Sequence, residues 1–237
     1  MLRCFKKKNL LRELEVKRKK YLEYNLPNPL KLNLNCSIPD RNTPFKALSF
    51  LVIDFETTGL EAENNDIISI GWVEISHMQI NLATQKHFYI NNSKRINHET
   101  AIINHIVPQM VSHGISLPEA INILLKSCQD KILVVHGKVI EKSFLDFYAQ
   151  QTLGLPALPL IWIDTLKIEQ WRALAQGADI YQDNRLSTAR ERYNLPQYNA
   201  HNALIDSISA AELLLAQIAH IYPGRKVTFE NLYEISQ

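Results

Sequence analysis

Two acidic residues, Asp54 and Glu56, end an apolar run and are separated by a single residue. The run Phe50-Leu51-Val52-Ile53 leads through them into Thr57-Thr58-Gly59, a pattern typical of a core strand that ends at a turn. This i, i+2 spacing places both carboxylates on one face of the strand. Like charges held side by side repel each other unless a cation lies between them, and hard cations such as Mg²⁺ prefer oxygen ligands. A strand end with two solvated acids is the simpler alternative.

A histidine and an aspartate, His201 and Asp206, form the second set of residues with chemical potential. His201 precedes the last predicted helix, and Asp206 lies five residues later in its first turns. Taken alone, this pair is better explained by a capping histidine and a surface acid, because a histidine five residues before an aspartate is a common pattern. Together with Asp54 and Glu56 it supplies three carboxylates for two divalent cations and one imidazole that accepts a proton near neutral pH. The four residues therefore predict a metal site with a general base.

The length and charge distribution indicate one domain with an appendage. The chain has 237 residues, 46% of them apolar, which is enough for a full hydrophobic core. Residues 1–50 contain twelve Lys and Arg against four Asp and Glu, a net charge of +8, whereas residues 51–237 carry fourteen against twenty, a net charge of −6. A basic arm is thus joined to a mildly acidic body.

The cysteines and the longest apolar runs indicate a cytoplasmic protein. Cys4, Cys36 and Cys128 are odd in number and far apart, so they predict neither a disulfide framework nor a zinc site, and a reducing compartment fits them best. Runs such as Phe50–Ile53 and Ile132–Val135 are too short to span a bilayer. The basic N-terminus does not lead into the apolar segment that a signal peptide needs, so we expect neither a signal peptide nor membrane association.

Two segments precede the predicted catalytic body. Residues 2–24 mix leucines with lysines and predict a basic amphipathic helix whose partner is either nucleic acid or the body itself. Residues 25–46 contain four prolines and predict an extended connector. We therefore divide the chain into residues 1–46, a basic helix with a Pro-containing connector; residues 47–220, the catalytic domain; and residues 221–237, a C-terminal tail.

The body predicts an α/β fold with a mixed five-stranded sheet and flanking helices. Three strands come first and form an antiparallel meander, and helices then alternate with two further strands. The expected strands lie at about residues 50–56, 66–76, 85–91, 131–136 and 160–163. The expected helices lie at residues 96–106, 117–128, 138–151 and 203–220.

With these features in order, the chain resembles the DnaQ-like 3′-to-5′ exonucleases of the DEDDh group, which include the proofreading epsilon subunit of bacterial DNA polymerase III. The motifs that carry the resemblance are residues 52–60 around Asp54 and Glu56, residues 134–145, and residues 201–206. The similar region runs from about Leu48 to Gln217. It implies the ribonuclease H-like exonuclease fold, in agreement with the order of strands and helices read from the sequence.

The chain departs from the family pattern at two places. In the second motif, five residues after His136, Glu141 replaces the usual aspartate. Glu141 keeps the charge and adds one methylene, so we expect it to serve the metal site. Asp146 is the competing acid, but the two positions lie about 140° apart on a helix, so only one can serve. The second departure is Ile103–Ile106, Ile-Asn-His-Ile, where the family tends to have His-Gly-Ile.

The resemblance also implies a role for each site residue. Asp54 would bridge two divalent cations, Mg²⁺ or Mn²⁺, while Glu56 and Asp206 complete the site that activates water and Glu141 supports the second ion. His201 would be the general base. Substrate contacts would come from the residues that follow the first strand, Thr57, Thr58 and Leu60.

The expected function is metal-dependent 3′-to-5′ exonuclease activity on DNA, with 5′-mononucleotides as products. A single-stranded 3′ end would be the substrate, and a replication or repair protein the partner. Two alternatives stay open: an exonuclease of RNA or oligonucleotides, because the motifs do not distinguish the sugars, and a non-catalytic interaction module with a nuclease fold. The four retained acids favour an enzyme over the interaction module.

Overall fold

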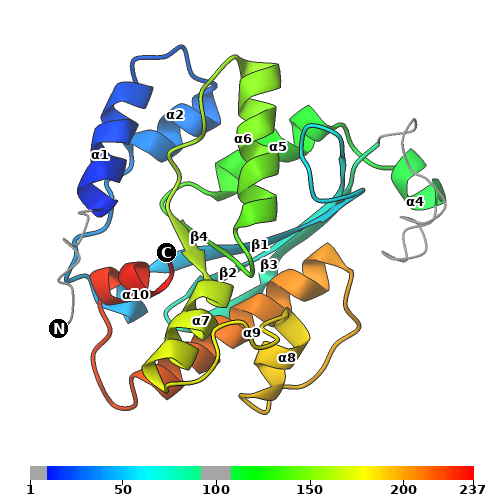
Figure 1. Cartoon of the computed structure of the whole chain (residues 1–237). Helices are drawn as coiled ribbons and strands as arrows, with labels where there is room; N and C mark the ends of the chain where they lie inside the picture. The colour runs from blue at the N-terminus through cyan, green and yellow to red at the C-terminus, as the bar shows by residue number, and fades with distance from the viewer. Residues whose placement is uncertain (1–9, 92–107) are drawn as a thin grey trace.

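The computed structural model describes residues 10–91 and 108–237. In this part of the chain, a mixed sheet lies between two groups of helices (Figure 1). Its strands are β1 Ser49–Thr57, β2 Ile67–Ser76, β3 Gln79–Tyr89, β4 Ile132–Val135 and β5 Trp162–Asp164, in the order β3-β2-β1-β4-β5. β1 pairs antiparallel with β2, which pairs antiparallel with β3, whereas β4 and β5 continue the sheet in parallel from β1. The predicted mixed five-stranded sheet is confirmed.

The helices cover both faces of this sheet. In Figure 1, α1, α2, α5 and α6 lie above it and α7, α8, α9 and α10 lie below it. Their bounds are α1 Leu10–Tyr21, α2 Asn28–Asn35, α4 Pro108–Ser112, α5 Leu117–Ser127, α6 Val139–Leu153, α7 Thr165–Ala175, α8 Leu186–Glu191, α9 Ala203–Ile221 and α10 Phe229–Ile235, with a short 3₁₀ helix, η1, at Phe45–Ala47.

Alternation along β1 determines which way the two acids face. Leu51 and every second residue after it pack into the core under α5 and α6. Phe50 and Val52 pack into the other core, against α9 and α10. Because successive side chains of a strand point to opposite faces, Asp54 and Glu56 continue the row of Phe50 and Val52. β1 therefore directs both carboxylates toward the side of the sheet that α9 covers.

Gly71 allows the start of α9 to approach the sheet closely. This glycine is the β2 partner of Asp54 in the antiparallel register. A Cβ atom at Gly71 would lie less than 3.0 Å from backbone atoms of Ala203 and Leu204, a separation that real Cβ atoms do not show. The absence of a side chain here lets the first turn of α9, with Asp206, lie beside the end of β1.

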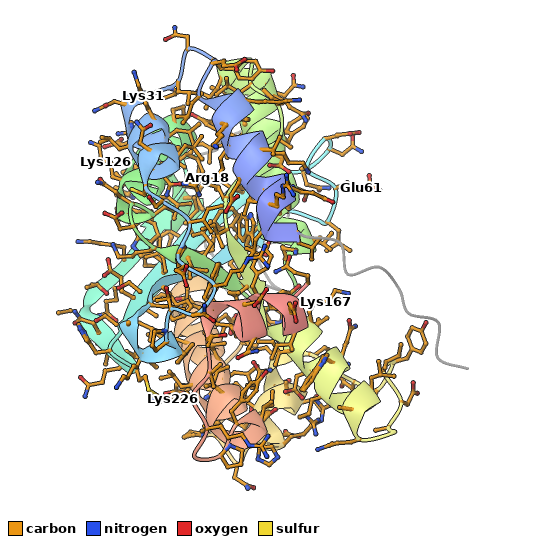
Figure 2. All side chains as sticks on the ribbon, turned by 90° about the vertical axis from the view of Figure 1, so that its left-hand side faces the viewer. Arg18, Lys31, Glu61, Lys126, Lys167 and Lys226 are labelled. Atoms are coloured by element: carbon orange, nitrogen blue, oxygen red, sulfur yellow. The ribbon has the colours of Figure 1, made fainter. Side chains whose placement is uncertain are left out.

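Arg18 ties the N-terminal helix to the body. The predicted basic helix is present as α1, and its first residues, up to residue 9, lie outside the described part of the chain. Figure 2 places Arg18 between α1 and α2, and its Nη2 donates to the carbonyl oxygens of Asn33 at 2.7 Å and Cys36 at 2.8 Å. This basic side chain is buried and stabilises the fold, while its neighbours on α1 face solvent.

The prediction that residues 25–46 are extended was wrong for α2. Pro29 occupies the first turn of this helix, where a proline is tolerated because its missing N–H would have no partner inside the helix. Leu30 and Leu34, one turn apart, are both buried against the core under α5. Burial of this apolar face outweighs the proline signal in the sequence.

The last residues of the chain pair with the segment before β1. The backbone N–H of Phe45 donates to the Val227 carbonyl at 2.8 Å, and the N–H of Phe229 donates to the Thr43 carbonyl at 2.9 Å. Phe229, the first residue of α10, is fully buried in the core beneath α9. Segments on both sides of the predicted catalytic domain therefore pack against it.

Two predicted features lie outside the described residues: the helix at residues 96–106 and the Ile103–Ile106 departure from the family pattern. Within the described residues, α9 is the one helix long and apolar enough to cross a membrane, with a mean hydropathy of 1.4. Its buried face packs on the sheet core, and its first turn carries Asp206. We attribute this apolar composition to the position of α9 in the core.

Candidate active site

Three carboxylates meet where β1 ends and α9 begins. One oxygen from each of Asp54, Glu56 and Asp206 lies within 4.8 Å of the other two. β1 supplies the first two from one face, and the close approach permitted by Gly71 brings the third. Glu56 is buried, and the other two acids are half-buried. The structure thus brings together three acids that lie up to 152 positions apart in the sequence.

Burial raises the pKa of each of these acids, and repulsion from neighbouring carboxylates adds to the effect for Asp54 and Glu56. Burial, followed by the charges of Glu141, Glu56 and Asp206, raises the pKa of Asp54 well above its ordinary value. Burial and then the charge of Asp206 raise the pKa of Glu56 to about 7. Burial also raises the pKa of Asp206, against two hydrogen bonds from backbone amides. A divalent cation would relieve this repulsion, so the donor set fits an ion with oxygen ligands.

Glu141 lies in the first turn of α6 and is 4% exposed. Burial raises the pKa of Glu141 to about 8, although hydrogen bonds with backbone groups, including Phe55, lower it. Within the described part of the chain, its Oε2 atom is buried and has no hydrogen-bond partner. An unpartnered buried carboxylate oxygen is costly, and a nearby cation would satisfy it. Of the neighbouring charges, that of Glu141 raises the pKa of Asp54 most.

Asp146, the competing acid of the second motif, bonds elsewhere. Its carboxylate forms an ion pair with Lys142 on the same helix and accepts a hydrogen bond from the Leu158 backbone N–H at 2.8 Å. These contacts fix the connection that follows α6. Of the two acids on this helix, Glu141 lines the cleft that contains Asp54, Glu56 and Asp206.

Asp164 fixes the start of two helices at once. It is the N-cap of α7, accepting from the Leu166 N–H at 3.0 Å. The same carboxylate accepts from the backbone N–H groups of Gly137 at 2.9 Å and Lys138 at 3.0 Å, just before α6. Asp164 therefore acts both as a cap and as a support for the helix that carries Glu141.

His201 lines three cavities of the described structure. Its side chain is exposed, and it lines the carboxylate cleft of about 440 Å³ and two adjoining cavities of about 470 and 320 Å³. Its backbone is left-handed, with φ of +68°, and its N–H donates to Asp206 Oδ2 at 2.9 Å. The imidazole is thus free to meet a water molecule beside the acids.

The residues after β1 form one wall of the same cleft. Thr57 donates from Oγ1 to the Gly59 carbonyl at 2.7 Å, and Thr58 accepts from the Asp66 N–H at 2.9 Å. Leu60 is 77% exposed at the edge of this wall. An apolar side chain that projects from a firmly bonded turn is suited to contact a flat apolar group such as a nucleobase.

His136 is a cleft residue to which the sequence reasoning assigned no role. Its Nδ1 lies 2.9 Å from Thr165 Oγ1 and its Nε2 lies 2.8 Å from the Asn184 carbonyl oxygen. A carbonyl oxygen only accepts, so Nε2 carries a proton. Burial lowers the pKa of His136. Its position five residues before Glu141 was the available signal, because that spacing puts it at the end of β4 beside α6.

Comparison with known sequences identifies a family and several relatives. The sequence profile of the RNase_T family, described as exonuclease, matches residues 51–214. The PolC-type DNA polymerase III of Thermotoga petrophila is 28% identical over 194 residues, which make up 82% of this chain and 13% of that protein. The corresponding polymerase of Thermotoga maritima is 30% identical over 174 residues, 73% of this chain and 12% of that protein. The chain thus spans about an eighth of the length of these relatives.

Solved structures show the same fold at low sequence identity. The nuclease domain of 3′hExo, a DEDDh family member bound to rAMP, superposes with a TM-score of 0.62 at 16% identity, over 75% of this chain and 95% of that one. Exonuclease X in complex with 5′ overhanging duplex DNA superposes with a TM-score of 0.59 at 21% identity, over 79% of this chain and 99% of that one. Both comparisons agree with the predicted ribonuclease H-like exonuclease fold.

Proposed function

The chain belongs to the RNase_T exonuclease family and to its DnaQ-like group, and from that premise we propose that it is a metal-dependent 3′-to-5′ exonuclease acting on DNA 3′ ends. The observation that carries the proposal is the set of three carboxylate oxygens within 4.8 Å of one another, beside an exposed histidine. A non-catalytic module would have no need to keep such a repulsive set of acids.

Divalent cations, Mg²⁺ or Mn²⁺, would be held by Asp54, Glu56 and Asp206, and Glu141 would support a second ion. When bound, such cations lower the pKa of a water molecule and neutralise charge on the phosphoryl oxygens. The raised pKa values of Asp54 and Glu56 support this assignment, because a cation replaces the protons that these acids otherwise retain.

His201 would act as the general base and take the proton of the attacking water at a ring nitrogen. Thr57 and Thr58 would hold the terminal nucleotide through backbone amides, and Leu60 would pack against its base. Hydrolysis of the last phosphodiester bond would then release a 5′-mononucleotide. The exposure of His201 and Leu60 on the same cleft supports this division of roles.

DNA is the favoured polynucleotide because the two Thermotoga relatives described above are named DNA polymerases. RNA is the second candidate, since a structural neighbour of the same fold is described as bound to rAMP. A replication or repair protein as partner and a cytoplasmic location are further parts of this proposal.

The basic side of the molecule is a candidate contact for nucleic acid beyond the cleft. Figure 2 shows Lys31 on α2 and Lys126 on α5 projecting outward at the upper left, with α1 to their right. α1 packs beside the start of β1, since Leu11 shares a core with Phe50. Asp54 and Glu56 follow Phe50 by four and six residues along this strand, which corresponds to about 13 to 20 Å. Only nucleotides several positions away from the cleaved 3′ end of the nucleic acid would reach these lysines.

Nuclease assays with purified protein would test the proposal. Labelled single-stranded DNA, 3′-recessed duplex DNA and RNA of one sequence would be incubated with Mg²⁺, Mn²⁺ or EDTA. We expect stepwise loss of 3′ nucleotides from DNA with either cation, and none with EDTA. Asp206→Asn should lower kcat at least about 10²-fold. Activity in EDTA, or wild-type activity of Asp206→Asn, would refute the metal-dependent mechanism, and a preference for RNA would select the second candidate.

A further inference from the structure

Arg190, at the end of α8, is a fully buried cation that the proposed chemistry does not use. Its side chain is 2% exposed. Burying a guanidinium group is unfavourable unless its charge is paired and its N–H groups are hydrogen-bonded. Within the described residues, Nε of Arg190 has no hydrogen-bond partner, whereas both Nη atoms have partners. Nη1 donates to the Ser209 carbonyl at 2.6 Å, and Nη2 donates to the Pro196 carbonyl at 2.6 Å and to Glu212 Oε2 at 2.7 Å. One side chain therefore connects α8, α9 and the segment that leads into α9.

Tyr198 completes this arrangement. The Arg190 guanidinium carbon lies 4.8 Å from the centre of the Tyr198 ring, a favourable cation–π geometry. The Tyr198 hydroxyl donates to Glu212 Oε1 at 3.0 Å, so the two oxygens of Glu212 hold one partner each. We call Arg190, Tyr198 and Glu212 the arginine clamp.

The clamp holds one end of a segment, residues 196–202, whose other end lies at the carboxylates. At that far end, Asp206 Oδ2 accepts from the N–H groups of His201 at 2.9 Å and Asn202 at 3.3 Å. Asn199 and Ala200, between the two anchors, are exposed. His201 also has a left-handed backbone, which is unfavourable for a residue with a Cβ and persists only where neighbouring contacts enforce it.

We propose that the arginine clamp is a positioning device: it fixes the start of residues 196–202 so that the His201 imidazole faces the carboxylates. This inference rests on the proposed role of His201 as general base. Arg190, Tyr198 and Glu212 act through His201 and do not contact the substrate. Loosening the clamp then lowers the fraction of molecules with a correctly placed base, which reduces kcat and leaves KM unchanged.

Tyr198→Ala is the main test, because Tyr198 is 43% exposed and its loss removes little of the core. The matched control is Tyr181→Ala, since Tyr181 is 87% exposed and lies outside the clamp. We expect kcat to fall about 10-fold for Tyr198→Ala, with KM within about twofold of wild type. Tyr198→Phe keeps the ring over Arg190 and should lose only about threefold. The control should match wild type.

A double-mutant cycle with His201→Ala separates positioning from general support of the fold. If Tyr198 acts through His201, adding Tyr198→Ala to His201→Ala causes no further loss of kcat. A further 10-fold loss in that background, or an increase in KM for Tyr198→Ala, would overturn the proposal, since Tyr198 would then act on the fold or on the substrate.

Amide hydrogen exchange supplies a readout that does not depend on activity. Residues 199–202 should exchange at least about fivefold faster in Tyr198→Ala than in wild type or in Tyr181→Ala, because their anchored end is released. Unchanged exchange would refute the clamp even if the nuclease proposal is correct. Conversely, wild-type activity of both His201→Ala and Asp206→Asn would refute the nuclease mechanism, whereas faster exchange in Tyr198→Ala would still support the clamp.

Discussion

Replacing Gly71 with alanine should lower the nuclease activity, although Gly71 itself carries no group that takes part in the reaction. The added Cβ would lie less than 3.0 Å from backbone atoms of Ala203 and Leu204. These atoms belong to the first turn of α9, and they cannot rotate away as a flexible side chain could. The shortest of these separations is 2.2 Å, so relieving the overlap to a normal contact distance of about 3.5 Å requires α9 to move from β2 by at least about 1.3 Å.

That movement carries Asp206 with it, because Asp206 follows Leu204 by two residues in the same turn. Asp54 stays in place, since it pairs with position 71 across the sheet. A misplacement of about 1 Å costs on the order of 10²-fold in rate. Overpacking of this kind costs about 1–3 kcal/mol of folding free energy. For a chain of this size each kcal/mol lowers Tm by about 2–4 °C.

The assay is steady-state hydrolysis of labelled single-stranded DNA with Mn²⁺, together with thermal unfolding of the same samples. Gly224→Ala is the matched control, because Gly224 has φ of +67° in open space beyond the far end of α9. Alanine there is strained and should lower Tm while leaving the rate unchanged. If Gly71→Ala retains kcat within twofold of wild type, close contact between Gly71 and α9 does not set the geometry of the site.

Three further predictions concern charge. Because the pKa values of Glu56 and Glu141 are raised to about 7 and about 8, the folded protein binds more protons than the unfolded chain above about pH 4.5. The Tm in EDTA should therefore fall by several degrees between about pH 5 and 8, and Mn²⁺ should reverse the fall; a Tm in EDTA that stays level or rises over this interval would contradict the assigned burial. Glu141→Gln should raise the Tm of the cation-free protein at pH 8 and lower kcat by about 10-fold or more, whereas Asp146→Asn should lower Tm and keep the activity; the reverse pattern would show that Asp146 is the acid of the second motif. Neutralising the exposed lysines of α1, which are Lys17, Lys19 and Lys20, should weaken the salt dependence of DNA binding measured by fluorescence anisotropy. The slope of log K against log salt concentration should change by up to about 0.7 per lost phosphate contact, and an unchanged slope would show that these lysines do not contact DNA.

The periodic patterns of the sequence predicted the strand and the helix that carry the clustered acids. The alternation after Phe50 placed Asp54 and Glu56 on one face of a strand, and the structure places them on the row of β1 that faces α9. The apolar spacing after residue 203 predicted α9 to within one residue of its observed end. Both predictions use only the periods of strand and helix, which a single sequence displays.

The remaining features depend on contacts between distant residues. In the sequence, Gly71 indicates only a residue that weakens a strand. Its role in letting α9 approach the sheet is visible only in the structure, where Ala203 lies against it. Arg190 lies in a stretch for which the sequence predicted no element, and it is buried because Glu212 and two carbonyl groups accept hydrogen bonds from it. α2 was missed for a related reason: the core that buries Leu30 and Leu34 is assembled from the rest of the chain.

The hydrogen bonds of Asp206 divide its two oxygens between two tasks. Oδ2 accepts from the N–H groups of His201 and Asn202, so Oδ1 is the oxygen left available as a ligand for the proposed cation. An asparagine at position 206 would offer one oxygen and one NH₂ group. The backbone N–H groups on one side and the proposed cation on the other both require an oxygen. Turned one way, its NH₂ group meets the two backbone N–H groups; turned the other way, it meets the ion. Isosteric replacement at position 206 therefore removes either the ligand or the support of the histidine, and no rotation of the amide restores both.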